Sequence, residues 1–311
     1  MVLNDVVHVF IINSSAGGKQ FSSEIRKKLA EKKDFEYYVF NTRTDYNAQD
    51  IIKEVERIFK GRKLRIYACG GSGNFCNSLN GIEDFENIEL GFYAKGLTND
   101  FLKCFSKKDR RKFEDLDALI EGKSVKIDYI QSDKYRSVNT FSVGLDSYFT
   151  QQMDRFRITG IFGKIVPYIL SLLFSVFGSP AYPYEIVVDG QTFKDRYSEV
   201  FFGNGGTIGG TLCFEKTPDY RDGKGFYYLI RKMNIFEEML GIINLSLKNE
   251  KGLEYKSTFG HADKITVKRR DGIAFSMDFD GELLPPQSEW NAYIVKEGLN
   301  FIIPKGVTLD E

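Results

Sequence analysis

The chain has 311 residues, more than a single hydrophobic core usually organises, so we expect two domains. Lysine plus arginine (43) equals aspartate plus glutamate (43), and this balance excludes the broad basic surface of a nucleic-acid-binding protein. Four cysteines without CxxC spacing and only two histidines argue against a zinc site and indicate free thiols in a reducing cytoplasm.

The first third of the chain alternates short apolar runs with helical patterns. We expect strands at 6–12, 35–40, 64–68 and 89–93, with helices at 21–32 and 48–59. This alternation predicts a parallel sheet covered on both faces, in which ligands bind at the carboxyl ends of the strands. Three strand ends carry polar segments with glycine, at 13–18, 70–74 and 95–100. We therefore expect these segments to line one crevice.

From about Val125 the pattern changes to longer runs of β-forming residues. We expect strands at 125–131, 135–143, 184–188, 196–202, 225–231, 264–267 and 274–278, with helices within 147–177 and 234–247. Asp189-Gly190 and Asp271-Gly272 are typical of two-residue hairpins. The predicted fold class is α/β plus all-β: a parallel α/β domain at 1–124 and a mainly antiparallel β-sandwich at 125–311, whose final strand can return to the first domain.

An apolar run at 165–177 is shorter than the roughly 20 residues of a membrane span, and it contains Pro167. We interpret it as a helix packed on a sheet, with a helix beside a lipid acyl channel or on a membrane surface as the alternative. The N-terminal apolar run at 6–12 is interrupted by His8 and lacks the pattern of a secretory leader. We expect a cytoplasmic protein, with peripheral contact at the inner membrane face left open.

The segment Gly70-Gly71-Ser72-Gly73-Asn74 follows a predicted strand and precedes a helical pattern. Glycine lets the backbone approach an anion closely, and the helix that follows offers unpaired N–H groups. This arrangement is typical of a phosphate-binding loop, although glycine clusters also form ordinary turns.

Several motifs in this order resemble the diacylglycerol kinase catalytic-domain family, a group of lipid kinases that includes bacterial diacylglycerol kinases and sphingosine kinases. In the first domain they are Asn13-Ser14-Ser15-Ala16-Gly17-Gly18, Thr42, Gly70 to Asn74 with Asn77 and Asn80-Gly81, and Gly96-Leu97-Thr98-Asn99-Asp100-Phe101. In the second they are Asn139 with Gly144-Leu145-Asp146, Asn204-Gly205 with Gly209-Gly210, Pro218 to Gly223, and Asp280-Gly281-Glu282.

The resemblance implies an ATP-dependent lipid kinase that uses Mg²⁺ and phosphorylates a hydroxyl of diacylglycerol or a similar lipid. It implies Asp280 as the general base, with Glu282 as a second candidate, and a magnesium site at Asp219, Asp222 and Lys224. The implied nucleotide-binding residues are Asn13, Ser14, Ser15, Ala16, Gly17, Thr42, Gly70, Gly71, Ser72, Gly73, Asn74, Phe75, Cys76, Leu97, Asn99 and Asp100. The expected partners are a nucleotide and a lipid substrate at a membrane surface; a homodimer is left open.

The chain departs from the family pattern at three positions. Ser72 replaces an aspartate, while Asn74 and Leu97 each replace a threonine. Serine can hydrogen-bond a phosphate but carries no charge. An active lipid kinase is therefore one hypothesis, and a catalytically impaired relative that binds nucleotide or lipid as a sensor or partner protein is the second. A soluble nucleotide kinase, such as an NAD kinase, is a third.

Overall fold

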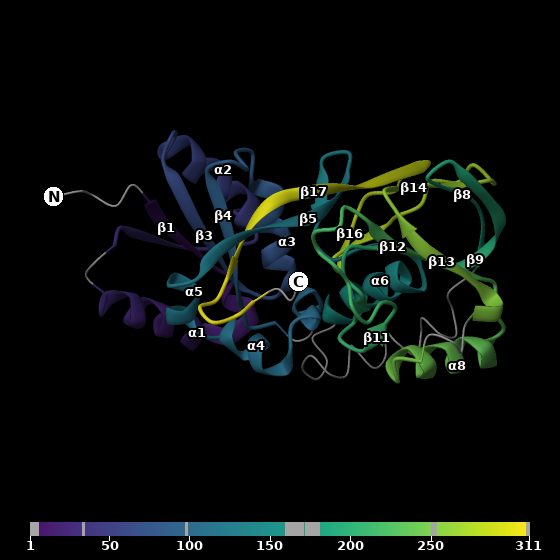
Figure 1. Cartoon of the computed structure of the whole chain (residues 1–311), viewed down its shortest axis with the longest axis horizontal. Coiled ribbons are helices and arrows are strands. Elements are labelled where there is room, and N and C mark those ends of the chain that lie inside the picture. The colour runs from purple at the N-terminus through teal and green to yellow at the C-terminus, as the bar shows by residue number, and fades with distance from the viewer. Residues whose placement is uncertain are drawn as a thin grey trace. The chain divides into compact units, whose positions relative to one another are not determined.

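The structure is a computed structural model that describes residues 6–32, 35–96, 99–158, 171, 181–249 and 254–308, without the side chains of 14–19 and 153–158. It divides into two compact units (Figure 1). Unit 1 comprises Met1–Tyr129 and Lys296–Glu311, and unit 2 comprises Ile130–Val295. The chain passes from one unit to the other along strands β5 (Lys123–Ser132) and β17 (Glu289–Ile303).

Unit 1 is an α/β unit built on a parallel sheet in the order β2-β1-β3-β4-β17. Its other elements are β1 (Val6–Ile12), α1 (Ser14–Ala30), β2 (Tyr37–Asn41), α2 (Ala48–Ile58), β3 (Lys63–Gly70), α3 (Ser72–Gly81), β4 (Ile88–Ala94), the 3-10 helix η1 (Asp100–Cys104), α4 (Lys107–Lys112) and α5 (Leu116–Ile120). The predicted parallel α/β fold is confirmed.

The strand order explains why helices cover both faces of this sheet. The chain moves one way from β1 to β2 and the opposite way from β2 to β3. Because such crossovers are right-handed, α1 and α2 must lie on opposite faces, and Figure 1 shows them on opposite sides of the strands. The direction of winding therefore changes between β1 and β3, so their carboxyl ends flank the switch point, where open α/β sheets bind ligands.

Local sequence signals account for the helix boundaries to different degrees. Asn47 begins α2 through a capping box with Asp50, and Ile51, Ile52 and Val55 form its buried stripe. The predicted helix at 21–32, by contrast, begins earlier than expected, at Ser14. The residues predicted as a polar loop after β1 are the first turns of α1, because this helix starts directly at the strand end without a connecting loop.

Unit 2 is mainly antiparallel, and the predicted second fold class is confirmed. Its elements are the end of β5, β6 (Tyr135–Ser137), β7 (Thr140–Gly144), α6 (Leu145–Ile158), β8 (Tyr182–Val188), β9 (Gln191–Gly203), β10 (Thr207–Ile208), β11 (Leu212–Cys213), β12 (Gly225–Arg231), α8 (Ile235–Ser246), β13 (Ser257–Ala262), β14 (Lys264–Arg269), β15 (Asp278–Phe279), β16 (Glu282–Leu283) and the first part of β17.

Strand β9 organises unit 2. One of its edges pairs with β12, while the other edge pairs first with β8 and then with β7. Its side chains alternate between two hydrophobic cores: Val200 and Phe202 lie in the larger core around Trp290, and Phe201 lies in the smaller core with Phe214 and other apolar side chains. The smaller core extends to Leu245 of α8.

The two predicted hairpins and the predicted helices of unit 2 have different outcomes. Asp189-Gly190 forms the predicted two-residue hairpin between β8 and β9. The prediction of a second hairpin at Asp271-Gly272 is wrong: these residues form a turn, but β14 pairs with β8 and β17 instead of the segment that follows it. The predicted helix at 234–247 is confirmed as α8. Helix α6 confirms the first part of the helical prediction at 147–177. The apolar run at 165–177 lies outside the described residues apart from Ser171.

Within the described parts of the chain, every helix is too short or too polar to cross a membrane.

Candidate functional site

Three strand ends of unit 1 meet closely at the carboxyl edge of its sheet. A Cβ atom added at Gly70 would lie 3.2 Å from Cβ of Asn13, at the end of β1, and 3.3 Å from Cβ of Asn74 in α3. A Cβ atom added at Gly96 would lie 2.7 Å from Cα of Gly71 and 2.4 Å from Oδ1 of Asn99. Only glycine at 96 therefore allows the segments after β3 and β4 to approach this closely. The predicted convergence of these segments is observed.

The N-terminus of α3 faces this edge without a side-chain cap. Its N-cap is Gly71, which has no side chain that could accept the first amide hydrogens. Ser72 follows, and its Oγ is buried without a hydrogen-bond partner among the described residues. Uncapped N–H groups and the positive end of the helix dipole favour an anion here. The Asn74 amide donates to the carbonyls of Ile11 and Cys69 (3.1 and 3.3 Å), so this residue joins β1 to β3.

The segment after β4 makes a tight turn. Asn99 is in the left-handed conformation (φ 47°), and its Nδ2 donates to the Gly96 carbonyl at 3.2 Å. Its Oδ1 is buried without a hydrogen-bond partner in the described structure. Asp100 then opens the 3-10 helix η1, as expected for a carboxylate at a helix start. Leu97 lies outside the described residues.

The remaining predicted nucleotide contacts occupy different places. Thr42 lies at the end of β2, where its N–H donates to the Ile12 carbonyl at 2.9 Å. Ser14, Ser15, Ala16 and Gly17 form the start of α1. The side chains of Phe75 and Cys76 are both buried, and their assignment to the nucleotide stays a prediction. Phe75 packs on Phe92 with a centroid distance of 4.8 Å, and its N–H donates to Gly71, so it serves the core.

In unit 2, Asp280 and Gly281 form the two-residue turn between β15 and β16. Both have positive φ (51° and 82°), as this turn type requires. The half-buried Asp280 carboxylate accepts the N–H groups of Val138 (3.1 Å) and Thr140 (2.8 Å). These bonds fix the side chain against the turn between β6 and β7. Glu282 begins β16 and is exposed.

Two other second-domain motifs, at Asn139 and Asn204-Gly205, pack against the turn that holds Asp280. The Asn139 carbonyl accepts the N–H groups of Asn204 and Gly205, both at 2.9 Å. The Asn204 side chain donates to the Val138 carbonyl at 3.2 Å. A Cβ atom at Gly205 would lie 1.9 Å from Oδ1 of Asn139, so the contact requires glycine. Motifs that are distant in sequence therefore pack together to position one carboxylate.

Four carboxyl groups of unit 2 influence one another electrostatically. Burial raises the pKa of Asp280 to about 6, although hydrogen bonds from the Ser137–Thr140 turn oppose this rise. Burial likewise raises the pKa of Asp146 to about 6, and the charge of Asp280 contributes to that rise. The pKa values of Glu199 and Asp278 lie well above their usual range because both are buried and Asp146 is nearby. Burial therefore favours the protonated form of Glu199 and Asp278.

Hydrogen bonds from neighbouring groups hold Asp146 and Glu199 in place. The Ser142 hydroxyl donates to Asp146 at 2.6 Å, and Ser142 lies opposite Asp278 in the β7–β15 pair. The Asp146 N–H donates to Glu199 at 3.0 Å. Oε1 of Glu199 and Oδ2 of Asp278 are buried without hydrogen-bond partners within the described residues. A protonated carboxyl is the state that such a site favours.

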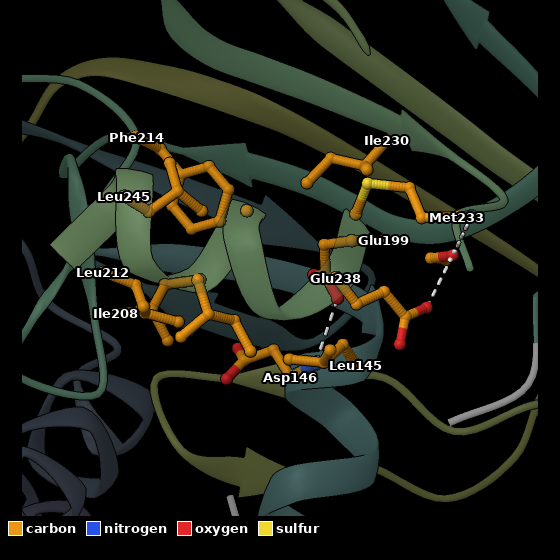
Figure 2. Close-up of a pocket in the computed structure, with 13 residues that line it drawn as sticks. Leu145, Asp146, Glu199, Ile208, Leu212, Phe214, Ile230, Met233, Glu238 and Leu245 are labelled. Carbon is orange, nitrogen blue, oxygen red and sulfur yellow. Dashed lines mark hydrogen bonds between the residues drawn. The ribbon is translucent and has the colours of Figure 1, made fainter. Parts of the chain in front are cut away.

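An apolar pocket ends at Asp146 and Glu199, two of these four acidic residues (Figure 2). It encloses about 480 Å³ of space not occupied by atoms, part of which is open to solvent. Asp146, Ser198, Glu199 and Glu238 are its polar lining residues, and burial raises the pKa of Glu238 to about 6. The other lining residues are Leu145, Ile208, Leu212, Phe214, Ile230, Met233, Gly241, Ile242 and Leu245. The pocket suits a ligand with an apolar chain and a polar end.

The predicted magnesium loop is a pair of turns at the surface. The Asp219 carboxylate accepts the Arg221 N–H at 2.9 Å, and the Asp222 carboxylate accepts the Lys224 N–H at 2.7 Å. The Lys224 ammonium pairs with Asp263 at 2.5 Å. Neither carboxylate forms part of a cluster of three or more metal-ligating side chains among the described residues. Magnesium at these residues stays a prediction.

Comparison with known proteins decides the family of the first domain. Residues 8–132 match the model of the diacylglycerol kinase catalytic domain. The match lies within the first half of the chain. The resemblance inferred from the motifs is therefore confirmed.

Named relatives agree with this assignment. The chain is 28% identical over 169 residues to "Putative lipid kinase YtlR" of Bacillus subtilis, a match that covers 49% of this chain but only 52% of that relative. It is 22% identical over 247 residues to "Putative lipid kinase SAS0691" of Staphylococcus aureus, covering 76% and 78% of the two chains. A solved structure described as a "putative diacylglycerol kinase" from Bacillus anthracis has a TM-score of 0.74, covering 99% of this chain and 98% of that one at 19% identity, which supports the fold.

Two members of the carboxyl group were missed by reasoning from the sequence. Glu199 lies in the apolar run of β9, where an acidic side chain is unexpected, and this exception was an available signal. Asp278 lies in β15, two residues before the Asp280 of the recognised motif, and its proximity to that motif was an available signal. A carboxylate within a buried strand therefore deserves the same scrutiny as a recognised motif.

Proposed function

We propose that the chain is an ATP-dependent lipid kinase that phosphorylates a hydroxyl of diacylglycerol or of a similar lipid. The observation that carries this proposal is the apolar pocket ending at Asp146 and Glu199, two members of the carboxyl group that includes Asp280. A lipid acyl chain would occupy the apolar part of the pocket, and its polar end would meet the carboxyl group. The diacylglycerol kinase catalytic domain at 8–132 supports the same activity.

Unit 1 would bind the nucleotide. The close approach of Gly71 and Gly96 brings main-chain groups, not charged side chains, to the carboxyl edge of the sheet. The uncapped N-terminus of α3 would donate its first N–H groups to phosphate oxygens. The Ser72 hydroxyl would add one neutral hydrogen bond where the family pattern has a carboxylate.

Asp280 is the proposed general base. Its two backbone hydrogen bonds orient the carboxylate, and each oxygen keeps a lone pair that can accept a proton. A pKa of about 6 leaves it mostly ionised near neutral pH yet more basic than an ordinary aspartate. As the lipid oxygen bonds to the γ-phosphorus, the hydroxyl proton would pass to Asp280 and the bond between phosphorus and ADP would break.

A second candidate function is supported by Ser72. A chain without a carboxylate at this position can bind a nucleotide or lipid without transferring phosphate. Such a chain would act as a sensor or partner protein, so binding and transfer must be measured separately.

The test incubates the full chain with radiolabelled ATP, magnesium and separate acceptors: diacylglycerol, ceramide, a sphingoid base and NAD. We expect label on the hydroxyl of a lipid. Labelled NADP would instead identify a nucleotide kinase. ATP binding without any labelled lipid would identify the non-catalytic relative.

A glycine substitution tests the nucleotide half of the proposal. In Gly96→Ala the new methyl group meets Asn99 and Gly71, so we expect the Kd for ATP to rise about tenfold, a loss of about 1.4 kcal/mol. Gly61→Ala is the control, because it adds the same methyl group where no atom lies within 4 Å, in the turn before β3 at the opposite edge of the sheet. Equal ATP affinity in the two variants would contradict the assigned site.

A further inference from the structure

Helix α8 has two apolar faces. Gly241, Ile242 and Leu245 line the pocket in unit 2. The opposite face carries large apolar side chains three, four, seven and eleven residues from Phe236, which is the spacing of one continuous helical stripe. This outer stripe consists of Phe236, Met239, Leu240, Ile243 and Leu247, and all five are exposed.

The exposure of the outer stripe is unusual for its residue types. Phe236 is 76% exposed, Leu240 58% and Leu247 73%. Isolated exposed apolar residues are normal, but a contiguous stripe of large ones marks an interaction surface. The helix has a stable N-terminus, because Asn234 and Glu237 form a capping box. The stripe is therefore presented on a regular helix.

The charges around α8 favour an anionic partner. Lys232 precedes the helix and Lys248 follows it, and both are exposed. The acidic residues of α8 do not oppose them: Glu237 pairs with Lys256 at 3.5 Å, and Glu238 is buried beside the pocket. The outer stripe thus has a cation at each end and no carboxylate within it. An interfacial helix on an anionic bilayer has this pattern.

We propose that α8 docks the chain on an anionic lipid bilayer, with its outer stripe in the interface and Lys232 and Lys248 at the headgroups. The opposite face of the same helix lines the apolar pocket, so docking brings the pocket within one helix diameter of the lipid. This inference rests on the proposed function for its purpose, since a bilayer would supply the acceptor lipid. The docking itself can be measured without catalysis.

The test measures co-sedimentation of the full chain with vesicles of phosphatidylcholine alone or mixed with phosphatidylglycerol, in the absence of ATP. We expect binding to the anionic vesicles, weakened by added salt. The double variant Phe236→Ser and Leu240→Ser should lower the partition coefficient at least about tenfold, because each large apolar side chain contributes roughly 1.5–3 kcal/mol when buried. Ile58→Ser is the matched control, since Ile58 of α2 is 55% exposed but lies in unit 1.

Three results would overturn the proposal. Equal vesicle binding by the double variant and the native chain would exclude α8 as the docking helix. A change from dimer to monomer in the double variant, measured by light scattering, would identify a second copy of the chain as the occupant. A large fall in its unfolding temperature would show that the stripe packs inside the folded chain.

Activity separates this inference from the proposed function. If both hold, the double variant phosphorylates lipid dispersed in detergent micelles at the native rate but loses activity on vesicles. If the chain is not a kinase, vesicle binding and its loss in the double variant are unchanged. If only docking fails, native and variant chains are equally active in both preparations.

Discussion

Two hairpins of unit 2 have the same turn sequence and different surroundings. Asp189-Gly190 joins β8 to β9, and Asp280-Gly281 joins β15 to β16. Their φ angles are nearly equal, 46° and 88° in the first turn and 51° and 82° in the second. Each aspartate accepts two N–H groups from a neighbouring segment: Asp189 from Asp263 and Lys264, and Asp280 from Val138 and Thr140.

The difference lies in what surrounds each carboxylate. Asp189 is exposed beside the start of β14, whereas Asp280 is half-buried, and its charge contributes to the raised pKa of Asp146. The local sequence determines the turn in both cases. Burial among distant strands raises the pKa of Asp280 to about 6. A turn motif therefore becomes a candidate catalytic residue through its tertiary environment.

The largest expected effect distinguishes the two aspartates directly. Asp280→Asn should lower kcat about 10²- to 10⁴-fold, because the amide cannot accept the proton of the lipid hydroxyl. Asp189→Asn should leave kcat unchanged while making the same change of side chain in the same type of turn. Lipid phosphorylation by both purified variants, with their unfolding temperatures, provides the comparison. Similar kcat values for the two variants would remove Asp280 from the mechanism.

The pH dependence sharpens the comparison further. Because Asp280 must be ionised to act as a base, kcat/KM should fall about tenfold per pH unit below its pKa of about 6. The same fall of kcat/KM at acidic pH should appear in Asp189→Asn and Glu282→Gln, since neither removes the base. The residual activity of Asp280→Asn should not show this fall. If the fall is absent from Glu282→Gln instead, the proton acceptor is Glu282.

The smallest expected effect concerns stability. The pKa of Glu199 is raised in the folded chain, so the folded state keeps a proton that the unfolded chain has lost. The free energy of unfolding therefore falls as pH rises above the unfolded pKa of about 4.5. Glu199→Gln mimics the protonated form and should raise Tm by about 2–4 °C at pH 8 for each kcal/mol regained.

Two measurements control this stability experiment. The gain from Glu199→Gln should disappear near pH 4, where both the folded and unfolded chains hold the proton. Glu185→Gln removes an exposed carboxylate that pairs with Lys194, and it should give no gain at high pH. A pH-independent change in Glu199→Gln would point to altered packing instead.

The sequence predicts the fold class well because periodicity and turn chemistry are local. The strands of unit 1, the Asn47 capping box and the Asp189-Gly190 hairpin all follow from neighbouring residues. The Asp271-Gly272 prediction failed because turn residues specify a change of direction, not which strands pair afterwards. The packing of Phe75 on Phe92 and Phe301 could not be predicted from its position in a motif, because only the tertiary structure brings these rings together.

In the candidate site, too, features set by neighbouring residues were predictable and features set by tertiary contacts were not. The sequence identified the glycines near Gly71 and Gly96 and the Asp280 turn, because motifs record such positions. It did not identify Glu199 as a neighbour of Asp146, since their contact joins β9 to the start of α6. The pocket behind them depends on α8, whose outer stripe is apolar like its inner face, so periodicity alone could not orient it.

The return of β17 to unit 1 has a consequence for synthesis of the chain. Asn300 donates to the Phe85 carbonyl at 2.7 Å, across 215 residues of sequence, and Phe301 packs among aromatic residues of unit 1. The N-terminal sheet thus lacks β17 as its edge strand until residues 296–303 have been synthesised. Closing so long a loop is entropically unfavourable and slows folding. While translation continues, the open edge of β4 is exposed to other chains, and this is the interval in which aggregation competes with folding.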